Sequence, residues 1–296
     1  MDRRRVAVRE GGLRALTGPQ AARPHFHLTT AARGFIVAAV ISVFALCSGY
    51  LELDRASMLD DLPAGQPWTV PVMSFLVVHP RGRLLFDTGV HCQTRVDPIG
   101  RMGPERAKRL VDKSKAGEDV VPQLGLLGLT PDDVRYVVNS HLHFDHCGGN
   151  EFFPRATFLV QKAEMEAARR PGFAPGYNPS PLDFDHPLDY RLVDGEHDVW
   201  GDGSVILFPT FGHTPGHQSL RVRAGKGQDL VCAADACYTR ENMDRDVLPR
   251  ILWNGPTMRE SLATLRRLRD QAGATVFYGH DPEQWRATPH APAAVV

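Results

Sequence analysis

Short apolar runs, separated by turns that contain glycine or proline, dominate the pattern of hydrophobic and polar positions along the chain. Runs of this length, bounded by such turns, are typical of buried β-strands. We therefore predict strands at residues 35–47, 72–78, 84–86, 134–138, 156–160, 205–208, 219–222, 230–233 and 274–278. The first ends at the turn signal Ser48-Gly49, and Pro80-Arg81-Gly82 predicts a hairpin between the second and third.

Helical patterns are fewer, and they lie between or after the predicted strands. They cover residues 105–113, a turn at 130–133 that begins with Thr-Pro-Asp-Asp, and residues 161–170. Near the C-terminus, Thr257-x-x-Glu260 has the spacing of a capping box, and an apolar stripe follows at helical spacing: Met258, Leu262, Leu265 and Leu268. Two groups of strands, each closed by helices, favour an α+β fold of two sheets packed face to face with helices outside.

Composition excludes some classes of function. Of the 296 residues, 43% are hydrophobic and 23% are charged, as in an ordinary globular protein with a sizeable core. Because 34 Lys and Arg balance 34 Asp and Glu, net charge gives no reason to expect a nucleic-acid partner. The five cysteines form no Cys-x-x-Cys pair, so neither a disulfide framework nor a zinc ribbon is indicated, and a reducing compartment is the simplest inference.

The N-terminal segment differs from the rest, with seven arginines in its first 34 residues and no apolar periodicity. We expect residues 1–38 to be a disordered basic extension, residues 39–290 to be a single domain and residues 291–296 to be a tail. A basic leader before an apolar run resembles an export signal, but cleavage after residue 47 would remove part of the first predicted strand. We therefore expect a cytoplasmic protein without a membrane partner, and export directed by residues 1–47 is the alternative.

The densest chemistry lies in residues 139–150, where three histidines and one aspartate occupy positions 141 to 146. His141 and His143 are two residues apart, so on an extended segment both side chains leave on the same face. Asp145 and His146 follow, and two glycines just behind them predict a turn into a helix. A solvated loop has no structural need for this cluster, so the segment predicts half of a metal site.

Three later motifs follow predicted strands and can complete this half-site. They are Gly212-His213-Thr214-Pro215-Gly216-His217, Ala233-Ala234-Asp235-Ala236-Cys237-Tyr238 and Tyr278-Gly279-His280-Asp281. Each motif alone is weak, because a histidine after a strand is more often a surface residue or a core residue with satisfied hydrogen bonds. Asp87, at the end of another predicted strand, either caps a turn or orients a metal-bound histidine.

Together these residues carry a resemblance to a known family. His141-x-His143-x-Asp145-His146, His213, Asp235 and His280 resemble, in order and context, the ligand set of the metallo-β-lactamase superfamily. Within it, the Gly-Gly-Asn after the first motif, Gly-His-Thr-Pro-Gly-His-Gln-Ser and Asp235-Ala-Cys-Tyr238 look most like the N-acyl-homoserine lactone lactonases, which are quorum-quenching enzymes. The resemblance covers residues from about 40 to 290. Phe211 departs from it, because relatives usually have proline there, and this should adjust the loop without removing the ligand.

The resemblance implies an αββα sandwich of two mixed sheets with helices outside, and a hydrolase that holds two zinc ions, other divalent metals being compatible. His141, His143 and His213 would hold one ion, Asp145, His146 and His280 the other, and Asp235 would bridge them, with His217 as the runner-up to His213. Five imidazoles and two carboxylates suit Zn²⁺ or a similar ion, and leave open positions for water and substrate. Two ions ~3.5–4 Å apart lower the pKa of a shared water to about 7, which gives hydroxide at neutral pH.

The resemblance also implies a reaction, the opening of a lactone ring by that bridging hydroxide, with N-acyl-homoserine lactone as the first substrate to expect. The lactone carbonyl would contact one zinc and the phenol of Tyr238, and the leaving alkoxide would be protonated by way of Asp145. Tyr238 as a buried aromatic without a catalytic role is the alternative. The expected partner is a small-molecule lactone, and a homo-oligomer is compatible with the sequence.

Other reactions use related sites. The same metals would serve another lactonase, acting on a small or vitamin-derived lactone. They would also serve a glyoxalase-II-like thioesterase, a β-lactamase or a phosphoesterase. No basic cluster near the motifs favours glutathione or phosphate as part of the substrate. The Pro- and Gly-rich residues 171–189 are expected to form a lid, a pocket wall or a linker. A pocket lined by these residues, Trp68 and Phe144 would favour an acyl chain. An iron-dependent, oxygen-using relative, such as a persulfide dioxygenase or a flavodiiron protein, is a further class, but the flavodiiron pattern has Glu in place of His143. A binding protein is disfavoured because no ligand position is missing.

Overall fold

The computed structural model describes residues 41–170, 172, 177–223 and 229–296. The predicted basic extension, residues 1–38, lies outside these residues, as do residues 35–40 of the first predicted strand. By its contacts the chain divides into Met1–Val37 and Ala38–Val296, and the described residues all belong to the second unit.

Within the described residues the strands form two sheets. The seven-stranded sheet has the order β4-β1-β2-β3-β5-β6-β7, and the five-stranded sheet has the order β12-β11-β10-β9-β8. In chain order the strands are β1 (Ser42–Asp54), β2 (Pro67–His79), β3 (Gly82–Phe86), β4 (Val111–Asp112), β5 (Tyr136–Val138), β6 (Thr157–Gln161), β7 (Asp189–Val193), β8 (His197–Asp198), β9 (Val205–Pro209), β10 (Gln218–Arg223), β11 (Asp229–Cys232) and β12 (Thr275–Phe277). Both sheets are mixed, since β3, β5, β6 and β7 pair in parallel, as do β11 and β12, whereas the other pairs are antiparallel.

The helices connect the strands and flank the sheets. They are α1 (Pro98–Met102), α2 (Pro104–Ala107), α3 (Val120–Gly125), α4 (Phe144–Cys147), α5 (Lys162–Ala168), α6 (Pro181–Phe184), α7 (Arg240–Arg245), α8 (Gly255–Asp270) and α9 (Pro282–Ala287). None of the described helices is both long and apolar enough to cross a bilayer, and α8, at 16 residues, is the longest of them.

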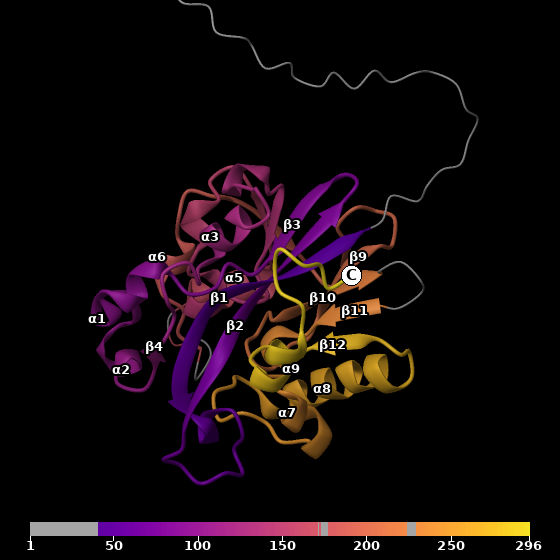
Figure 1. Ribbon diagram of the computed structural model, residues 1–296. Coiled ribbons are helices and arrows are strands. Elements are labelled where there is room, and N and C mark those ends of the chain that lie inside the picture. Colours follow the sequence, from indigo (N-terminus) through magenta and orange to yellow (C-terminus); the bar gives the residue numbers. More distant parts are fainter. Residues whose placement is uncertain (1–40, 171, 173–176, 224–228) are drawn as a thin grey trace, which may run out of the picture. The chain divides into compact units, whose positions relative to one another are not determined.

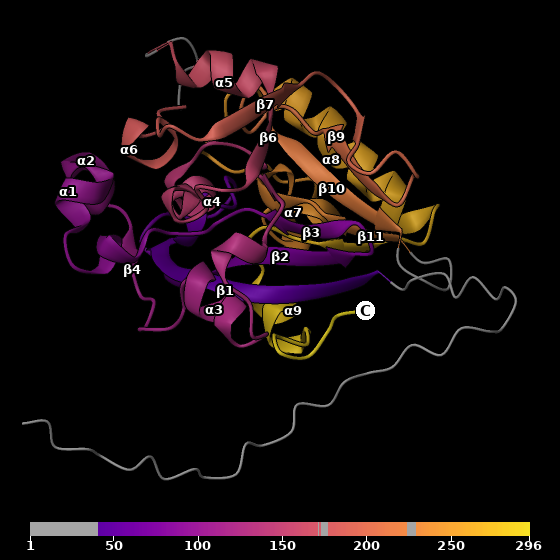
Figure 2. The same ribbon diagram turned by 90° about the horizontal axis from the view of Figure 1, so that it is seen from above.

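Alternating apolar residues along the strands produce the layers. Phe75 of β2 lies in the core between the two sheets, with Leu207 and Leu220 of the five-stranded sheet, whereas the neighbouring Leu76 packs on the outer face with Leu124 of α3. On the outer face of the second sheet, β11 and β12 pack against α8, and Figure 1 shows α8 alongside these strands. Figure 2 shows α3 beside β1. The predicted αββα sandwich is confirmed.

The first strand corrects one prediction. β1 does not end at Ser48-Gly49 but continues to Asp54, and its pairing with β2 shifts register between Cys47 and Gly49. Gly49 adopts φ 143°, so the glycine supports a β-bulge rather than a turn. The long strand therefore pairs with β2 from Ser42 to Asp54 and with β4 near its C-terminal end.

Two helical predictions also need correction. The helix predicted at 105–113 is shorter, because α2 ends at Ala107 and Val111–Asp112 pairs with β1 as strand β4. Thr257 does not cap the last long helix, since α8 begins at Gly255 and the side chain of Asn254 accepts the Thr257 N–H. Residues 171–189 contain a regular turn of helix, α6, although residues 171 and 173–176 lie outside the described part.

The end of the chain is tied to the first sheet. Val295 donates its backbone N–H to the carbonyl of Val43 at 2.7 Å, and Val43 donates to Val296 at 2.9 Å. Ala291 also donates to the carbonyl of Ala45 at 3.0 Å. Contacts with β1 therefore continue past residue 290, where the tail was expected to begin.

Candidate metal centre

The seven candidate ligands come together at the carboxyl ends of four strands. Residues 141–146 follow β5, His213 follows β9, Asp235 follows β11 and His280 follows β12. Two groups form, each with its ligand atoms within 4.8 Å of one another: His141, His143, His213 and Asp235 in one, and Asp145, His146 and His280 in the other. The fold thus joins motifs that are up to 139 residues apart, from 141 to 280, in one place.

In the first group, ring nitrogens converge on one carboxylate oxygen. His143 Nδ1 lies 3.0 Å from Nε2 of both His141 and His213. Oδ2 of Asp235 lies 3.2 Å from His213 Nε2 and 3.7 Å from His141 Nε2. Three imidazole nitrogens and one carboxylate oxygen therefore surround a common point.

In the second group the other oxygen of Asp235 takes part. Oδ1 of Asp235 lies 3.2 Å from His146 Nε2 and 3.1 Å from His280 Nε2. The same two nitrogens lie 3.9 Å and 3.8 Å from Oδ2 of Asp145. One carboxylate, that of Asp235, thus faces both groups with different oxygens, which is the arrangement a bridging ligand needs.

The hydrogen bonds of Nδ1, the ring nitrogen that faces away from Asp235 in His280 and His213, indicate that these residues fit a cation. His280 Nδ1 donates to the carbonyl of Pro71 at 2.9 Å, and His213 Nδ1 to that of Ile251 at 3.2 Å. With the proton on Nδ1, the neutral form of each ring directs the lone pair of Nε2 toward the Asp235 carboxylate, the position that a metal ligand needs. Within the described residues, Nε2 of the buried His146 and Oδ1 of Asp235 have no hydrogen-bond partner. A cation between them would satisfy lone pairs that otherwise repel one another.

Burial sets the charge states that metal binding requires. Burial, together with the neighbouring imidazoles, lowers the pKa of His141 and His143 well below the usual value, so these rings are neutral. Burial acts in the opposite sense on Asp235, but the imidazoles of His146 and His280 hold the pKa of this carboxyl well below its usual range. At His146 and His280 burial also acts to lower the pKa, but the negative charge of Asp235 raises the pKa of both rings. The centre therefore combines neutral rings at His141 and His143 with an ionised Asp235 carboxylate, and a metal ion would take the place of the protons that this carboxylate attracts to His146 and His280.

Asp87 supports the centre from behind, as one of the two sequence readings proposed. Its Oδ2 lies 2.8 Å from His146 Nδ1 and accepts the Ser140 hydroxyl, and its Oδ1 accepts the Ser140 N–H at 2.7 Å. Ser140 Oγ in turn lies 3.0 Å from His141 Nδ1. Asp87 adopts φ 63°, a left-handed conformation that costs a non-glycine residue about 1–3 kcal/mol and that clusters at functional sites.

Glu164, on α5, is a support that the sequence did not indicate. Its side chain is buried, Oε1 accepts the Leu142 N–H at 2.9 Å and the Tyr177 hydroxyl at 2.6 Å, and Oε2 accepts the Thr214 hydroxyl at 2.7 Å and the Gly216 N–H at 2.9 Å. A Cβ at Gly216 would lie 2.1 Å from the backbone nitrogen of Glu164, so this close approach requires glycine. One carboxylate thus fixes the loops that carry His141, His143 and His213.

Two further predicted residues lie next to the ligands. Tyr238 is buried, its hydroxyl lies 3.3 Å from His213 Nδ1, and burial raises its pKa well above the usual value. His217 lies outside both ligand groups. Its Nδ1 lies 2.9 Å from Thr210 Oγ1, and its ring centroid is 5.1 Å from that of His141.

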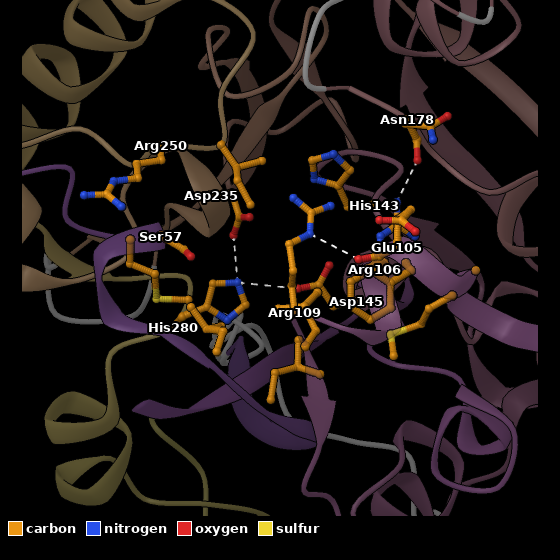
Figure 3. Close-up of a pocket in the computed structure, with 18 of the residues that line it drawn as sticks. Ser57, Glu105, Arg106, Arg109, His143, Asp145, Asn178, Asp235, Arg250 and His280 are labelled. Carbon is orange, nitrogen blue, oxygen red and sulfur yellow. Dashed lines mark hydrogen bonds and ion pairs between the residues drawn. The ribbon is translucent and has the colours of Figure 1, made fainter. Parts of the chain in front are cut away.

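A cavity of about 700 Å³ opens onto the centre and is shown in Figure 3. Its lining corrects two expectations. Phe144 lines it, as predicted, but Trp68 does not, and packs instead in the apolar cluster that contains Leu53 and Phe144. The cavity also carries a basic group that the sequence did not reveal, made of Arg106, Arg109 and Arg250.

Residues 67–280 match the model of the Metallo-beta-lactamase superfamily. The chain belongs to this superfamily, as the motifs predicted. It is 36% identical over 259 residues to the N-acyl homoserine lactonase AttM of Rhizobium radiobacter, which covers 85% of this chain and 97% of that one. It is also 32% identical over 254 residues to an N-acyl homoserine lactonase from a Bacillus species, covering 83% of this chain and 96% of the relative.

A solved structure gives the same result for the fold. It is that of an N-acyl homoserine lactone hydrolase with the product N-hexanoyl-L-homoserine bound at the catalytic metal centre. The two chains superpose with a TM-score of 0.78 at 29% identity, covering 86% of this chain and 99% of the other. The predicted resemblance to this group of lactonases is confirmed.

Proposed function

We propose that this protein is a metal-dependent lactonase that hydrolyses N-acyl-homoserine lactones. The observation that carries the proposal is the Asp235 carboxylate, which faces two groups of histidine and aspartate ligands beside a cavity and the Tyr238 hydroxyl. The similarity to relatives named as N-acyl homoserine lactonases supports the choice of substrate.

We assign two ions, zinc in the first instance, to these groups. His141, His143 and His213 would hold one, Asp145, His146 and His280 the other, and Asp235 would bridge them. When bound, the metal supplies a Lewis acid for the carbonyl oxygen and lowers the pKa of water toward neutrality.

The side chains around the metals would position the lactone and move the protons. Because burial keeps the Tyr238 phenol protonated, it can donate a hydrogen bond to the carbonyl oxygen as negative charge develops there. Asp145, on the cavity wall and 9% exposed, would pass a proton to the ring oxygen as the ring opens. The cavity volume of about 700 Å³ is in the range of small-molecule sites.

We also propose that the enzyme is cytoplasmic. All five cysteines are free thiols, and four of them are buried, which is compatible with a reducing compartment and a cytoplasmic enzyme. Fractionation of the native host, with N-terminal sequencing of the recovered protein, tests this location against export by residues 1–47.

The test of function is hydrolysis of N-hexanoyl-homoserine lactone by the purified, zinc-loaded protein, followed by chromatography of the ring-opened product. A thioester and a β-lactam are assayed beside it. His213→Ala should abolish ring opening, and His197→Ala, on the edge strand β8, is the matched control that should not. Faster turnover of the thioester or the β-lactam than of every lactone would overturn the proposal.

A further inference from the structure

Two arginines on the cavity wall, Arg106 and Arg109, form no ion pair with a carboxylate among the described residues. The carboxyl group whose charge interacts with that of Arg106 belongs to Asp183, which pairs with Arg101 at 2.8 Å. Arg106 belongs to α2 and Arg109 to the turn that follows it, where its N–H donates to the carbonyl of Arg106 at 2.9 Å. Three residues apart in one helical turn, their side chains lie on the same face. Figure 3 shows both among the side chains that line the cavity, together with His143 and Asp145.

The hydrogen bonds of both guanidinium groups go to neutral partners. Arg106 donates to the carbonyl of Asn178 at 2.8 Å and stacks 5.0 Å from the centre of the Phe144 ring. Arg109 donates from Nε to the carbonyl of Glu105 at 3.2 Å. The Glu105 carboxylate is not their counter-ion, because it pairs with Lys108 Nζ at 2.6 Å.

The third arginine of the cavity differs from these two. Nε of Arg250 lies 3.1 Å from a carboxylate oxygen of Asp60, and Nη2 donates to the carbonyl of Leu62 at 2.8 Å. Its charge is already paired. The unpaired positive charge of the wall is therefore concentrated on Arg106 and Arg109, whose ten N–H donors are largely available to a ligand.

The cavity lining contains apolar side chains as well as this pair of arginines. Leu51, Leu53, Met58, Met102 and Leu110 line the cavity and offer apolar surface to an acyl chain. On the same cavity wall, the planar guanidinium groups match the geometry of a carboxylate, which they can bind with two parallel hydrogen bonds.

We propose that Arg106 and Arg109 form a carboxylate-binding subsite, and that the preferred lactones carry a carboxylate at the far end of the acyl chain. This inference rests on the proposed lactonase function and adds the substrate class. A neutral acyl chain of equal length leaves the two guanidinium groups unpaired and gains nothing from them.

The test compares three lactones with six-carbon acyl chains: N-adipoyl-, N-adipamoyl- and N-hexanoyl-homoserine lactone. The first ends in a carboxylate, the second in a neutral amide of nearly the same shape, and the third in a methyl group. For the wild type, we expect kcat/KM to be about 10-fold higher for adipoyl than for adipamoyl, since one charge-assisted pair has this size. A wild-type ratio at or below one overturns the subsite.

Substitutions assign the preference to the two side chains. Arg109→Gln and Arg106→Gln should each lower the ratio by about 3-fold, and the double variant should bring it to about one. Arg106→Lys, which keeps the charge beside Phe144, should retain most of the preference. Lys108→Gln, an exposed lysine in the same turn, is the matched control and should leave the ratio unchanged. A double variant, Arg106→Gln with Arg109→Gln, that keeps the wild-type ratio contradicts the assignment.

A binding measurement separates this inference from the lactonase function. If N-hexanoyl-homoserine lactone is opened but the adipoyl lactone is not preferred, the subsite is wrong and the lactonase function stands. If no lactone is opened, the lactonase function is wrong, and calorimetric binding of ring-opened N-adipoyl- and N-adipamoyl-homoserine decides the subsite. About 10-fold tighter binding of the adipoyl compound, lost in the double variant, supports it, and equal binding overturns it.

Discussion

Replacing Glu164 by glutamine should weaken both the fold and the metal centre. The carboxylate accepts four hydrogen bonds, two on each oxygen, and although burial raises the pKa of Glu164, all four groups favour the ionised form. A glutamine of the same shape has only one carbonyl oxygen. Whichever way the amide is turned, its NH₂ group meets two donors, on Leu142 and Tyr177 or on Thr214 and Gly216.

The expected loss follows from these contacts. A hydrogen bond to a charged group contributes about 1.5–3 kcal/mol, so losing two of them costs about 3–6 kcal/mol before the loops relax. We expect small shifts of Tyr177, which is followed by the exposed Asn178, to recover part of this loss. The remaining decrease in the free energy of unfolding should be about 3 kcal/mol. Displaced loops also hold His141, His143 and His213 less well, which should lower zinc affinity about 10- to 100-fold.

Urea unfolding of the metal-free protein and zinc titration against a competing chelator measure the two effects. Glu166→Gln is the matched control, because Glu166 lies on the same helix, is exposed and forms a surface ion pair with Lys162 at 4.0 Å. The control should stay within about 0.5 kcal/mol of the wild type. If Glu164→Gln also stays within that range and binds zinc normally, the four hydrogen bonds do not support the centre and the reasoning is refuted.

Three further substitutions test other parts of the site. Tyr238→Phe should lower kcat for lactone opening about 100-fold with zinc content unchanged, and unchanged turnover of every lactone would exclude the phenol as a donor. Asp87→Asn should lower zinc affinity about 10- to 100-fold in the same titration, and normal affinity would contradict the role of its bond to His146. Asp183 lies buried in α6, and burial raises its pKa from 3.8 to about 7, so its proton stabilises the fold below pH 3.8 and this contribution is lost between pH 3.8 and about 7. Between pH 3.8 and about 7, the free energy of unfolding should therefore fall less for Asp183→Asn than for the wild type. An equal fall for the two proteins would contradict the raised pKa of Asp183.

The strands that the sequence predicted are those whose two faces are both buried. Leu84 and Phe86 of β3 face the core between the sheets while Leu85 faces the outer helices, so the apolar run is continuous. The missed strands lack this signal: β4 and β8 have two residues each, and β7 is mostly exposed. Glycine at position 49 misled the prediction because a bulge and a turn use the same residue, and only the partner strand distinguishes them.

The ligands were predictable because each lies in a short motif directly after a strand, whereas their supports were not. Glu164 contacts residues 22, 50 and 52 positions away, and its own surroundings in sequence look like an ordinary helix surface. Arg106 and Arg109 likewise appeared as charges on a predicted helix. Their place on the cavity wall depends on how α2 packs near Phe144, which no local pattern contains.

The two supports should act on the ions differently, because they contact different ligands. Of the segments that carry ligands, Glu164 contacts those of His141, His143 and His213, whereas Asp87 contacts His146 directly and reaches His141 through Ser140. A two-phase zinc titration should therefore show that Glu164→Gln weakens one ion and Asp87→Asn both. At the first ion the double variant should lose less than the sum of the single effects, since both supports act on residues 140–143. Equal weakening of both ions by Glu164→Gln would mean that the shared Asp235 couples the ions more strongly than either support holds its own ligands.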